Sequence, residues 1–227
     1  VVSSVGIPAA NVLREKFGTP FLLGTPVDGY VEKISDALTQ VVEKAGGEVW
    51  SRQQKPRGKG AVQEAAGADI NRRYGKEWKQ DDLWKVTQDQ VIYIQGEAGN
   101  MSTVSAAETG DLSGESGQPD ITVISEPVTM GSLAAAIEHK YEKKVRLLCP
   151  LEITEGLLRK GDLAIRGEEA MEEKLKAAKI IIADPLYRPI CPENARFYDL
   201  PHIAFSGRIY LRKIKEMILP DIITCDL

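Results

Sequence analysis

Short apolar segments alternate with amphipathic segments along much of this chain. A short apolar run is typical of a strand that is buried on both faces of a parallel sheet, and an amphipathic run is typical of a helix that covers such a sheet. The clearest amphipathic pattern lies in residues 30–45, whose apolar positions fall on one helical face: Val31, Ile34, Leu38, Val41 and Val42. The alternation predicts an α/β fold with parallel strands and crossover helices.

The same pattern predicts the individual elements. The predicted parallel strands are residues 1–4, 20–23, 121–125, 145–149 and 179–183, with shorter extended pieces at 163–165 and 195–200. The predicted helices are residues 9–17, 30–45, 132–141 and 167–178, and residues 126–131 are expected to be a loop. This order is typical of Rossmann-like units with mostly parallel sheets and crossover helices.

Two such Rossmann-like units are expected. Residues 1–50 are predicted to form the first, incomplete at its start, and residues 120–227 the second. Residues 51–119 are predicted to connect them, and 51–60 and 96–120 have the composition of mobile surface loops. The chain starts with the end of a strand and no initiator methionine, so we expect a fragment of a larger protein. A weak similarity between the two ends of the chain indicates either duplicated units or only the general likeness of βαβ segments.

Composition narrows the class of protein. The chain has 227 residues, of which 43% are hydrophobic and 27% charged, so it can bury a substantial core. Its net charge of −4 gives no basic footprint for nucleic acid. The three cysteines are too scattered for a disulfide framework, which favours a reducing compartment. No apolar run approaches the roughly 18 residues of a membrane span, and no signal peptide is visible. We therefore expect a cytoplasmic protein with no nucleic-acid or membrane partner.

The side chains that could bind a ligand or take part in a reaction are concentrated in residues 179–210. An apolar strand there leads into loops that carry one of the only two histidines. In an open α/β sheet, the loops that leave the carboxyl ends of the strands are where ligands bind. The candidate residues of these loops are His202, Cys191, Asp184, Ser206, Gly207 and Arg208.

Two segments of the chain resemble one protein family. The run LREKFGTPFLLGTPVDG before a long helix, and the strand IIIADPLYRPICP followed by LPHIAFSGRIY, are similar to nitrogenase component 1 and its relatives. These include molybdenum-iron protein subunits, cofactor-assembly scaffolds and tetrapyrrole reductases. The resemblance covers residues 1–50 and 120–215 and is to the carboxyl-terminal part of a subunit. It implies Rossmann-like domains, a paired homologous subunit, and electrons delivered by an ATP-driven iron-sulfur reductase.

Only some of the functional residues of this family have a counterpart in the chain. His202, which precedes Ser206 and Gly207, is similar to the family's cofactor-ligating histidine, with a spacing one residue shorter. It is therefore a candidate metal ligand or proton donor, and the alternative is a histidine that only packs in its loop. The family's cofactor-binding cysteine has no counterpart, because the first strand ends at Val2, Ser3 and Ser4. Cys191, Ser206, Gly207, Arg208 and Asp184 are candidates for binding the cofactor, although Cys191 can equally be an ordinary, partly buried thiol.

Three functions stay open from the sequence. In the first, the chain is part of a nitrogenase-like oxidoreductase. It binds either an iron-sulfur or related metal cluster or a tetrapyrrole, for reduction with electrons from the partner reductase. The second is a non-catalytic scaffold or pairing subunit of such a complex. The third is a small-molecule-binding α/β module of glycosyltransferase type, which predicts a phosphate-binding helix terminus near Gly131. No cofactor and no activity are expected from residues 1–227 alone.

Overall fold

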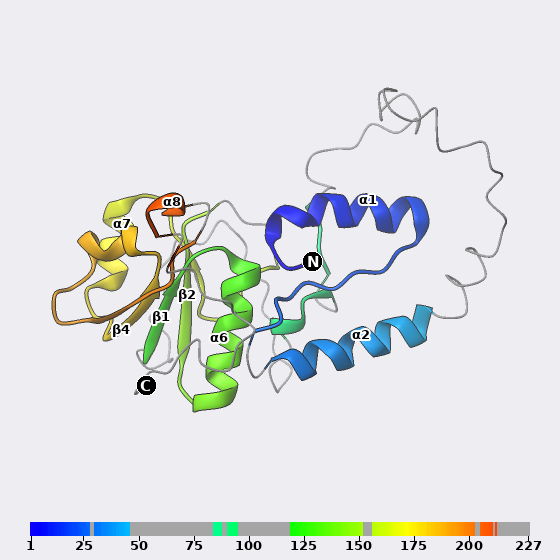
Figure 1. Cartoon of the computed structure of the whole chain (residues 1–227), viewed down its shortest axis with the longest axis horizontal. Helices are drawn as coiled ribbons and strands as arrows, with labels where there is room; N and C mark the ends of the chain where they lie inside the picture. Colours follow the sequence, from blue (N-terminus) through cyan, green and yellow to red (C-terminus); the bar gives the residue numbers. More distant parts are fainter. Residues whose placement is uncertain are drawn as a thin grey trace, which may run out of the picture.

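The computed structural model describes residues 1–27, 30–45, 84–87, 90–94, 119–151, 156–202, 205–210 and 212. A five-stranded sheet with the order β3-β2-β1-β4-β5 forms the carboxyl-terminal part, and each neighbouring pair of strands is parallel (Figure 1). The strands are β1 (Ile121–Ile124), β2 (Val145–Cys149), β3 (Leu163–Ala164), β4 (Ile180–Ala183) and β5 (Arg196–Asp199). The predicted α/β fold is confirmed, as are the strands expected in this part of the chain.

The central strands are apolar because they are covered on both faces. Every residue of β1 is buried, including Thr122. Ile121 and Val123 belong to one cluster of buried side chains and Ile124 to another, as expected for alternate residues of a strand. A strand with two buried faces shows a continuous apolar run, which made β1, β2 and β4 visible in the sequence.

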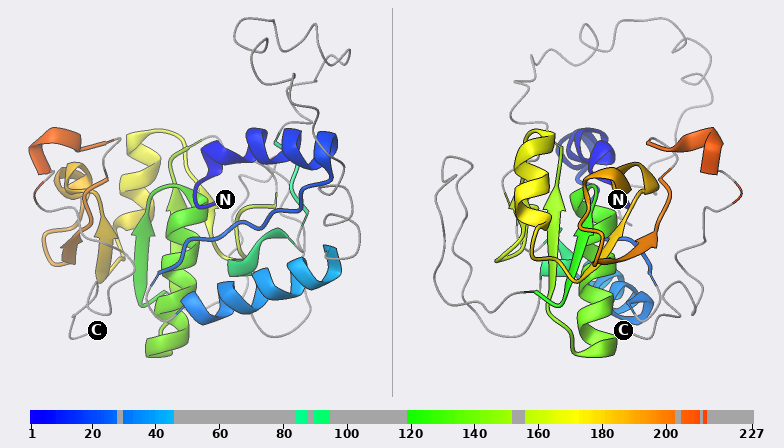
Figure 2. Two further views of the ribbon diagram at one scale, coloured as in Figure 1. Left: turned by 45° about the vertical axis from the view of Figure 1, so that its right-hand side comes forward. Right: turned by 90° about the vertical axis from the view of Figure 1, so that its left-hand side faces the viewer.

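Helices cover the two faces of the sheet (Figure 2). The helix α6 (Pro127–Tyr141) packs with the first cluster, and α7 (Glu168–Leu175) packs with the second through Met171 and Leu175. The 3-10 helix η4 (Pro185–Ile190) follows β4, and the short α8 (Gly207–Tyr210) follows β5. No helix among the described residues is long and apolar enough to cross a membrane.

The predicted loop 126–131 is wrong, because α6 begins at Pro127. Glu126 is the N-cap residue, and its carboxylate accepts hydrogen bonds from the backbone N–H groups of Val128 (3.1 Å) and Thr129 (2.6 Å). Proline and glycine suggested a loop here. However, proline is well tolerated at the first helical position, where its missing N–H leaves no intrahelical bond unmade.

The amino-terminal part contains η1 (Ser4–Gly6), α1 (Ile7–Phe17), α2 (Val31–Ala45) and η3 (Ile92–Ile94). The helices confirm the sequence pattern, but the strands predicted at 1–4 and 20–23 are wrong. Leu23 forms a single parallel bridge with Val91, and Val1 exchanges backbone hydrogen bonds with Leu22 (2.8 Å) and Gly24 (3.0 Å).

These pairings stay one residue long for local reasons. A 3-10 turn begins at Ser4, and Pro20 has no N–H to donate to a ladder. Described residues of the amino-terminal part therefore contain parallel contacts but no second sheet, and the Rossmann-like unit expected at residues 1–50 stays a prediction. Most of the proposed connecting region lies outside the described residues, including the predicted loop 51–60 and all but the last two residues of the predicted loop 96–120.

One buried cluster joins the amino-terminal segments to α6. The Tyr30 hydroxyl donates to the Ile92 carbonyl (2.9 Å), and the Tyr93 hydroxyl donates to the Leu157 carbonyl (3.0 Å). A Cβ atom at Gly131 would lie 2.6 and 2.8 Å from ring atoms of Tyr93, so the helix and this ring approach each other only because residue 131 is glycine.

The substitution Gly131→Ala is expected to destabilise the protein by about 1–2 kcal/mol, because overpacking a filled core outweighs the higher helix propensity of alanine. Urea unfolding followed by circular dichroism measures this loss. In a Tyr93→Leu background the same substitution should cost much less, because the ring is absent. An equal loss in both backgrounds would contradict a direct contact between the new methyl group and Tyr93.

Candidate functional site

The candidate site lies at the carboxyl ends of β1 and β4. From β1 the chain crosses through α6 to β2 on one side, whereas β4 pairs with β1 on the other side. The adjoining carboxyl ends of β1 and β4 therefore form the topological switch point of the sheet, where open α/β proteins bind their ligands. Ser125 and Glu126 follow β1 there, and Asp184 follows β4.

Asp184 holds the loops of this edge together. Its side chain is buried, and it accepts hydrogen bonds from the Leu186 N–H (3.0 Å), the His202 N–H (2.8 Å) and the Ser206 hydroxyl (2.6 Å). The first bond caps η4. The other two fix the turn after β5 onto the end of β4. Both carboxylate oxygens are thus used by protein donors, which makes Asp184 a positioning residue.

The hydrogen bonds also control the charge of Asp184. Burial by itself raises the pKa of this carboxyl group, but the bonds from His202, Ser206 and Leu186 outweigh burial and hold the pKa below its ordinary value. Asp184 is therefore ionised at neutral pH. An ionised acceptor makes its hydrogen bonds stronger than a neutral one would.

His202 lies on a tight turn and is half-buried. Its carbonyl accepts hydrogen bonds from the N–H groups of Phe205 (3.0 Å) and Ser206 (3.1 Å), and its ring meets the Phe205 ring edge-on at 5.4 Å between centroids. The backbone of His202 is thus fixed from both ends, by Asp184 and by the turn. This arrangement presents the imidazole at the carboxyl edge of the sheet.

The other predicted residues have different surroundings. Ser206 is buried and its hydroxyl is bound to Asp184, whereas Gly207 opens α8 with a φ of 40°. The side chain of Arg208 lies outside the described part of the structure. The structure therefore brings Asp184, His202 and Ser206 together.

Cys191 does not belong to this constellation. Its thiol lies 3.1 Å from the Tyr187 carbonyl, and burial raises its pKa to about 11. A metal ligand must be a thiolate, so this environment favours the ordinary, partly buried thiol. Within the described residues, no three His, Cys, Asp or Glu side chains are grouped so that they could hold a metal ion. These residues by themselves do not fit a metal cluster.

Sequence reasoning missed Ser125 and Glu126, which follow β1 on the other side of the switch point. Glu126 is 4% exposed and, besides capping α6, accepts a hydrogen bond from the Ser4 N–H (3.3 Å). The Ser125 hydroxyl is buried and has no hydrogen-bond partner among the described residues. An internal carboxylate thus occupies the N-terminus of α6, and Gly131 lies inside the helix. The phosphate site expected near Gly131 is wrong for this reason. A Glu-Pro pair was the available signal, because it fits an N-cap followed by the first helical residue.

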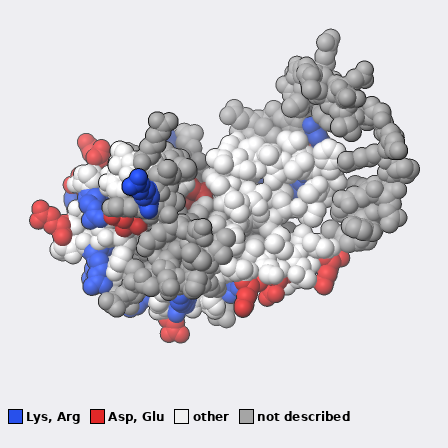
Figure 3. Space-filling view, in the orientation of Figure 1, with Lys and Arg blue, Asp and Glu red and all other residues white. Residues whose placement is uncertain are grey.

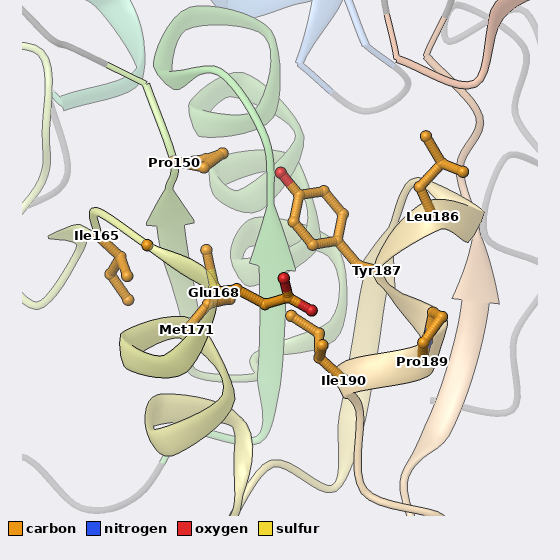
Figure 4. Close-up of a pocket in the computed structure, with 9 residues that line it drawn as sticks. Pro150, Ile165, Glu168, Met171, Leu186, Tyr187, Pro189 and Ile190 are labelled. Atoms are coloured by element: carbon orange, nitrogen blue, oxygen red, sulfur yellow. The ribbon is translucent and has the colours of Figure 1, made fainter.

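A cleft of about 340 Å³ lies on the α7 side of the same edge (Figure 4). Its lining includes Leu186, Tyr187, Pro189 and Ile190 of the predicted loop, but neither His202 nor Ser206. Glu168, which is exposed at the first position of α7, also lines the cleft.

Comparisons of the chain with protein-family models, with curated proteins and with solved structures give no match. The resemblance to nitrogenase component 1 therefore rests on the residues quoted for it.

Proposed function

We propose that this chain is the carboxyl-terminal part of a nitrogenase component 1-like oxidoreductase subunit, and that His202 serves its redox site as a proton donor. The single observation that carries the proposal is the attachment of the His202 turn to ionised Asp184 at the carboxyl edge of β4 and β5. Fixed backbone geometry of this kind preorganises a side chain for chemistry at a ligand. The resemblance supplies the reaction class.

The proposed chemistry uses His202 as a source of protons. A two-electron reduction consumes two protons, and an imidazole that is half-buried at the sheet edge can transfer a proton and regain it from water. The electrons come from a partner iron-sulfur reductase, and a paired homologous subunit completes the site. Since the described residues do not fit a metal cluster, we assign no metal-ligand role to His202.

The substitution His202→Ala in the complete complex tests this function. Reductive turnover should fall by at least about tenfold, because general acid catalysis typically contributes a factor of about 100 or more and water replaces the imidazole only in part. The chain provides a matched control in His139, its other histidine, which is exposed on α6. His139→Ala should leave turnover unchanged. Equal turnover of His202→Ala and the wild type, with both proteins folded, would contradict the proposal.

A non-catalytic pairing subunit is the second candidate, and an exposed apolar surface favours it. The face over α1 carries few charged side chains (Figure 3). Val5 of η1 is 78% exposed, and Phe17 at the end of α1 is 55% exposed. Apolar surface of this kind suits a homologous subunit. Turnover that survives His202→Ala but is lost with Phe17→Glu, together with loss of the paired complex, would select this function over the first.

A further inference from the structure

The cleft between α7 and η4 is built from three separate segments of the chain. Pro150 follows β2, the segment from Ile165 after β3 to Glu168 at the start of α7 provides the second part, and Tyr187 and Ile190 belong to η4 (Figure 4). All three segments leave the carboxyl ends of parallel strands. The volume of about 340 Å³ is at the lower end of the range of small-molecule sites, so the cleft suits a compact ligand.

The lining of the cleft is mainly apolar. Met171 and Ile165 are almost fully buried at its base, with 2% and 6% of their surfaces exposed. Leu186 lies in the lining as well, yet it is 54% exposed. An exposed leucine beside a cleft with buried apolar side chains provides surface that an apolar ligand would cover.

The charge of the cleft favours a cation. Among the described residues that line the cleft, Glu168 is the only charged one, and it is exposed at the rim. Figure 4 shows this carboxylate directed away from Met171, between the ring of Tyr187 and the side chain of Ile190. Ionised Asp184 lies near enough to raise the pKa of Tyr187, although burial of this phenol raises it more. Glu168 lies in the first turn of α7, so the roughly half positive charge at this helix end offsets only part of the charge of its carboxylate.

Tyr187 supplies a second polar group. Its ring is half-buried and packs at a tilt against Phe205, at 6.4 Å between centroids. Its hydroxyl points into the cleft towards Pro150 (Figure 4) and stays protonated at neutral pH, because its pKa is raised. The hydroxyl has no hydrogen-bond partner among the described residues, and an aromatic face beside a carboxylate is a favourable environment for a cation.

We propose that this cleft binds a compact apolar molecule that carries a protonated amine, with Glu168 as the counter-ion and Tyr187 as its hydrogen-bonding and aromatic partner. The apolar body of the ligand lies against Met171 and Ile165. His202 is not among the residues that line the cleft, and the proposal goes beyond the redox function proposed above.

Methionine methyl groups report binding at this site directly. Met171 lines the cleft, whereas Met130 is buried in the cluster on the opposite face of the sheet and serves as an internal control. We would titrate 2-phenylethylamine into the whole chain labelled with 13C at its methionine methyl groups. A probe of this size is expected to bind with an affinity of about 1 mM. The Met171 signal should shift and the Met130 signal should not.

Matched probes and variants measure how much the charge of the ligand and the charge of Glu168 contribute to binding. Neutral 2-phenylethanol should bind at least about fivefold more weakly than the amine, because a charge-assisted hydrogen bond is lost. Glu168→Gln should remove this preference, whereas Glu169→Gln, at an exposed neighbour that does not line the cleft, should keep it. Tyr187→Phe should weaken binding of the amine by a few-fold.

The opposite results would overturn the proposal. One is the absence of a Met171 shift at an amine concentration about ten times the expected Kd. The others are equal binding of the amine and the alcohol, and a preference for the amine that survives Glu168→Gln. The redox function has a separate test in His202→Ala, so the failure of one proposal is distinguishable from the failure of the other.

Discussion

Replacing Arg159 by methionine is expected to lower the free energy of unfolding by about 3–5 kcal/mol, because removing one partner of a buried ion pair leaves the other charge uncompensated. The Arg159 side chain is 11% exposed and that of Asp162 1%. Nε of Arg159 lies 2.9 Å from Oδ2 of Asp162, and Nη1 lies 2.8 Å from Oε2 of Glu138. The guanidinium group thus joins the loop before β3 to α6.

The network around Arg159 also includes the backbone. Its Nη2 donates to the Val145 carbonyl (3.1 Å), and the Asp162 carboxylate accepts the Leu147 N–H (2.8 Å), so both side chains are attached to β2. The charges of its partners raise the pKa of Arg159 although burial opposes this, so the guanidinium stays charged. Methionine retains much of the apolar stem but none of these bonds.

Urea unfolding at neutral pH measures the effect of Arg159→Met. The matched control is Lys160→Met, which removes a positive charge from the exposed neighbouring residue and should change stability by less than about 0.5 kcal/mol. A similarly small loss for both variants would mean that the buried network contributes little. In that case the loop before β3 would have to be held by Leu157 and the apolar contacts around it.

The sequence predicted the sheet better than it predicted the surroundings of the sheet. Strands β1, β2 and β4 are buried on both faces, so their continuous apolar runs identify them without knowledge of their neighbours. The bonds of Val1 with Leu22 and Gly24 do not extend into a ladder, and neither does the bridge of Leu23 to Val91 far along the chain, so a turn and a distant segment limit the strands expected there. Such limits are set by tertiary contacts.

The candidate site was predictable as a location but not as a set of roles. A histidine and an aspartate after apolar strands indicated the carboxyl edge, and the structure brings Asp184, His202 and Ser206 together there. The positioning role of Asp184 depends on the path of β5, which returns the chain to the end of β4. Sequence spacing also does not reveal that the first turn of α7, with exposed Glu168, borders a cleft.

Replacing Asp184 by asparagine is expected to cost about 3 kcal/mol at neutral pH. Hydrogen bonds to a charged group contribute about 1.5–3 kcal/mol each and are not additive, and a neutral amide retains only part of those made with Leu186, His202 and Ser206. Urea unfolding measures the global loss. Hydrogen exchange at the His202 amide should accelerate, because this N–H loses its carboxylate acceptor.

The pH dependence of this loss follows from the lowered pKa of Asp184. A carboxyl group with a lower pKa in the folded state stabilises the protein above its unfolded pKa, here 3.8, and loses this contribution as the pH falls through the folded pKa. The stability difference between wild type and Asp184→Asn should therefore be constant near neutral pH and shrink below about pH 4. The matched control is Asp199→Asn, which breaks the more exposed ion pair with Arg188 and should cost less than about 1 kcal/mol. Equal losses for the two variants, or an unchanged His202 amide in Asp184→Asn, would show that Asp184 does not fix the histidine turn.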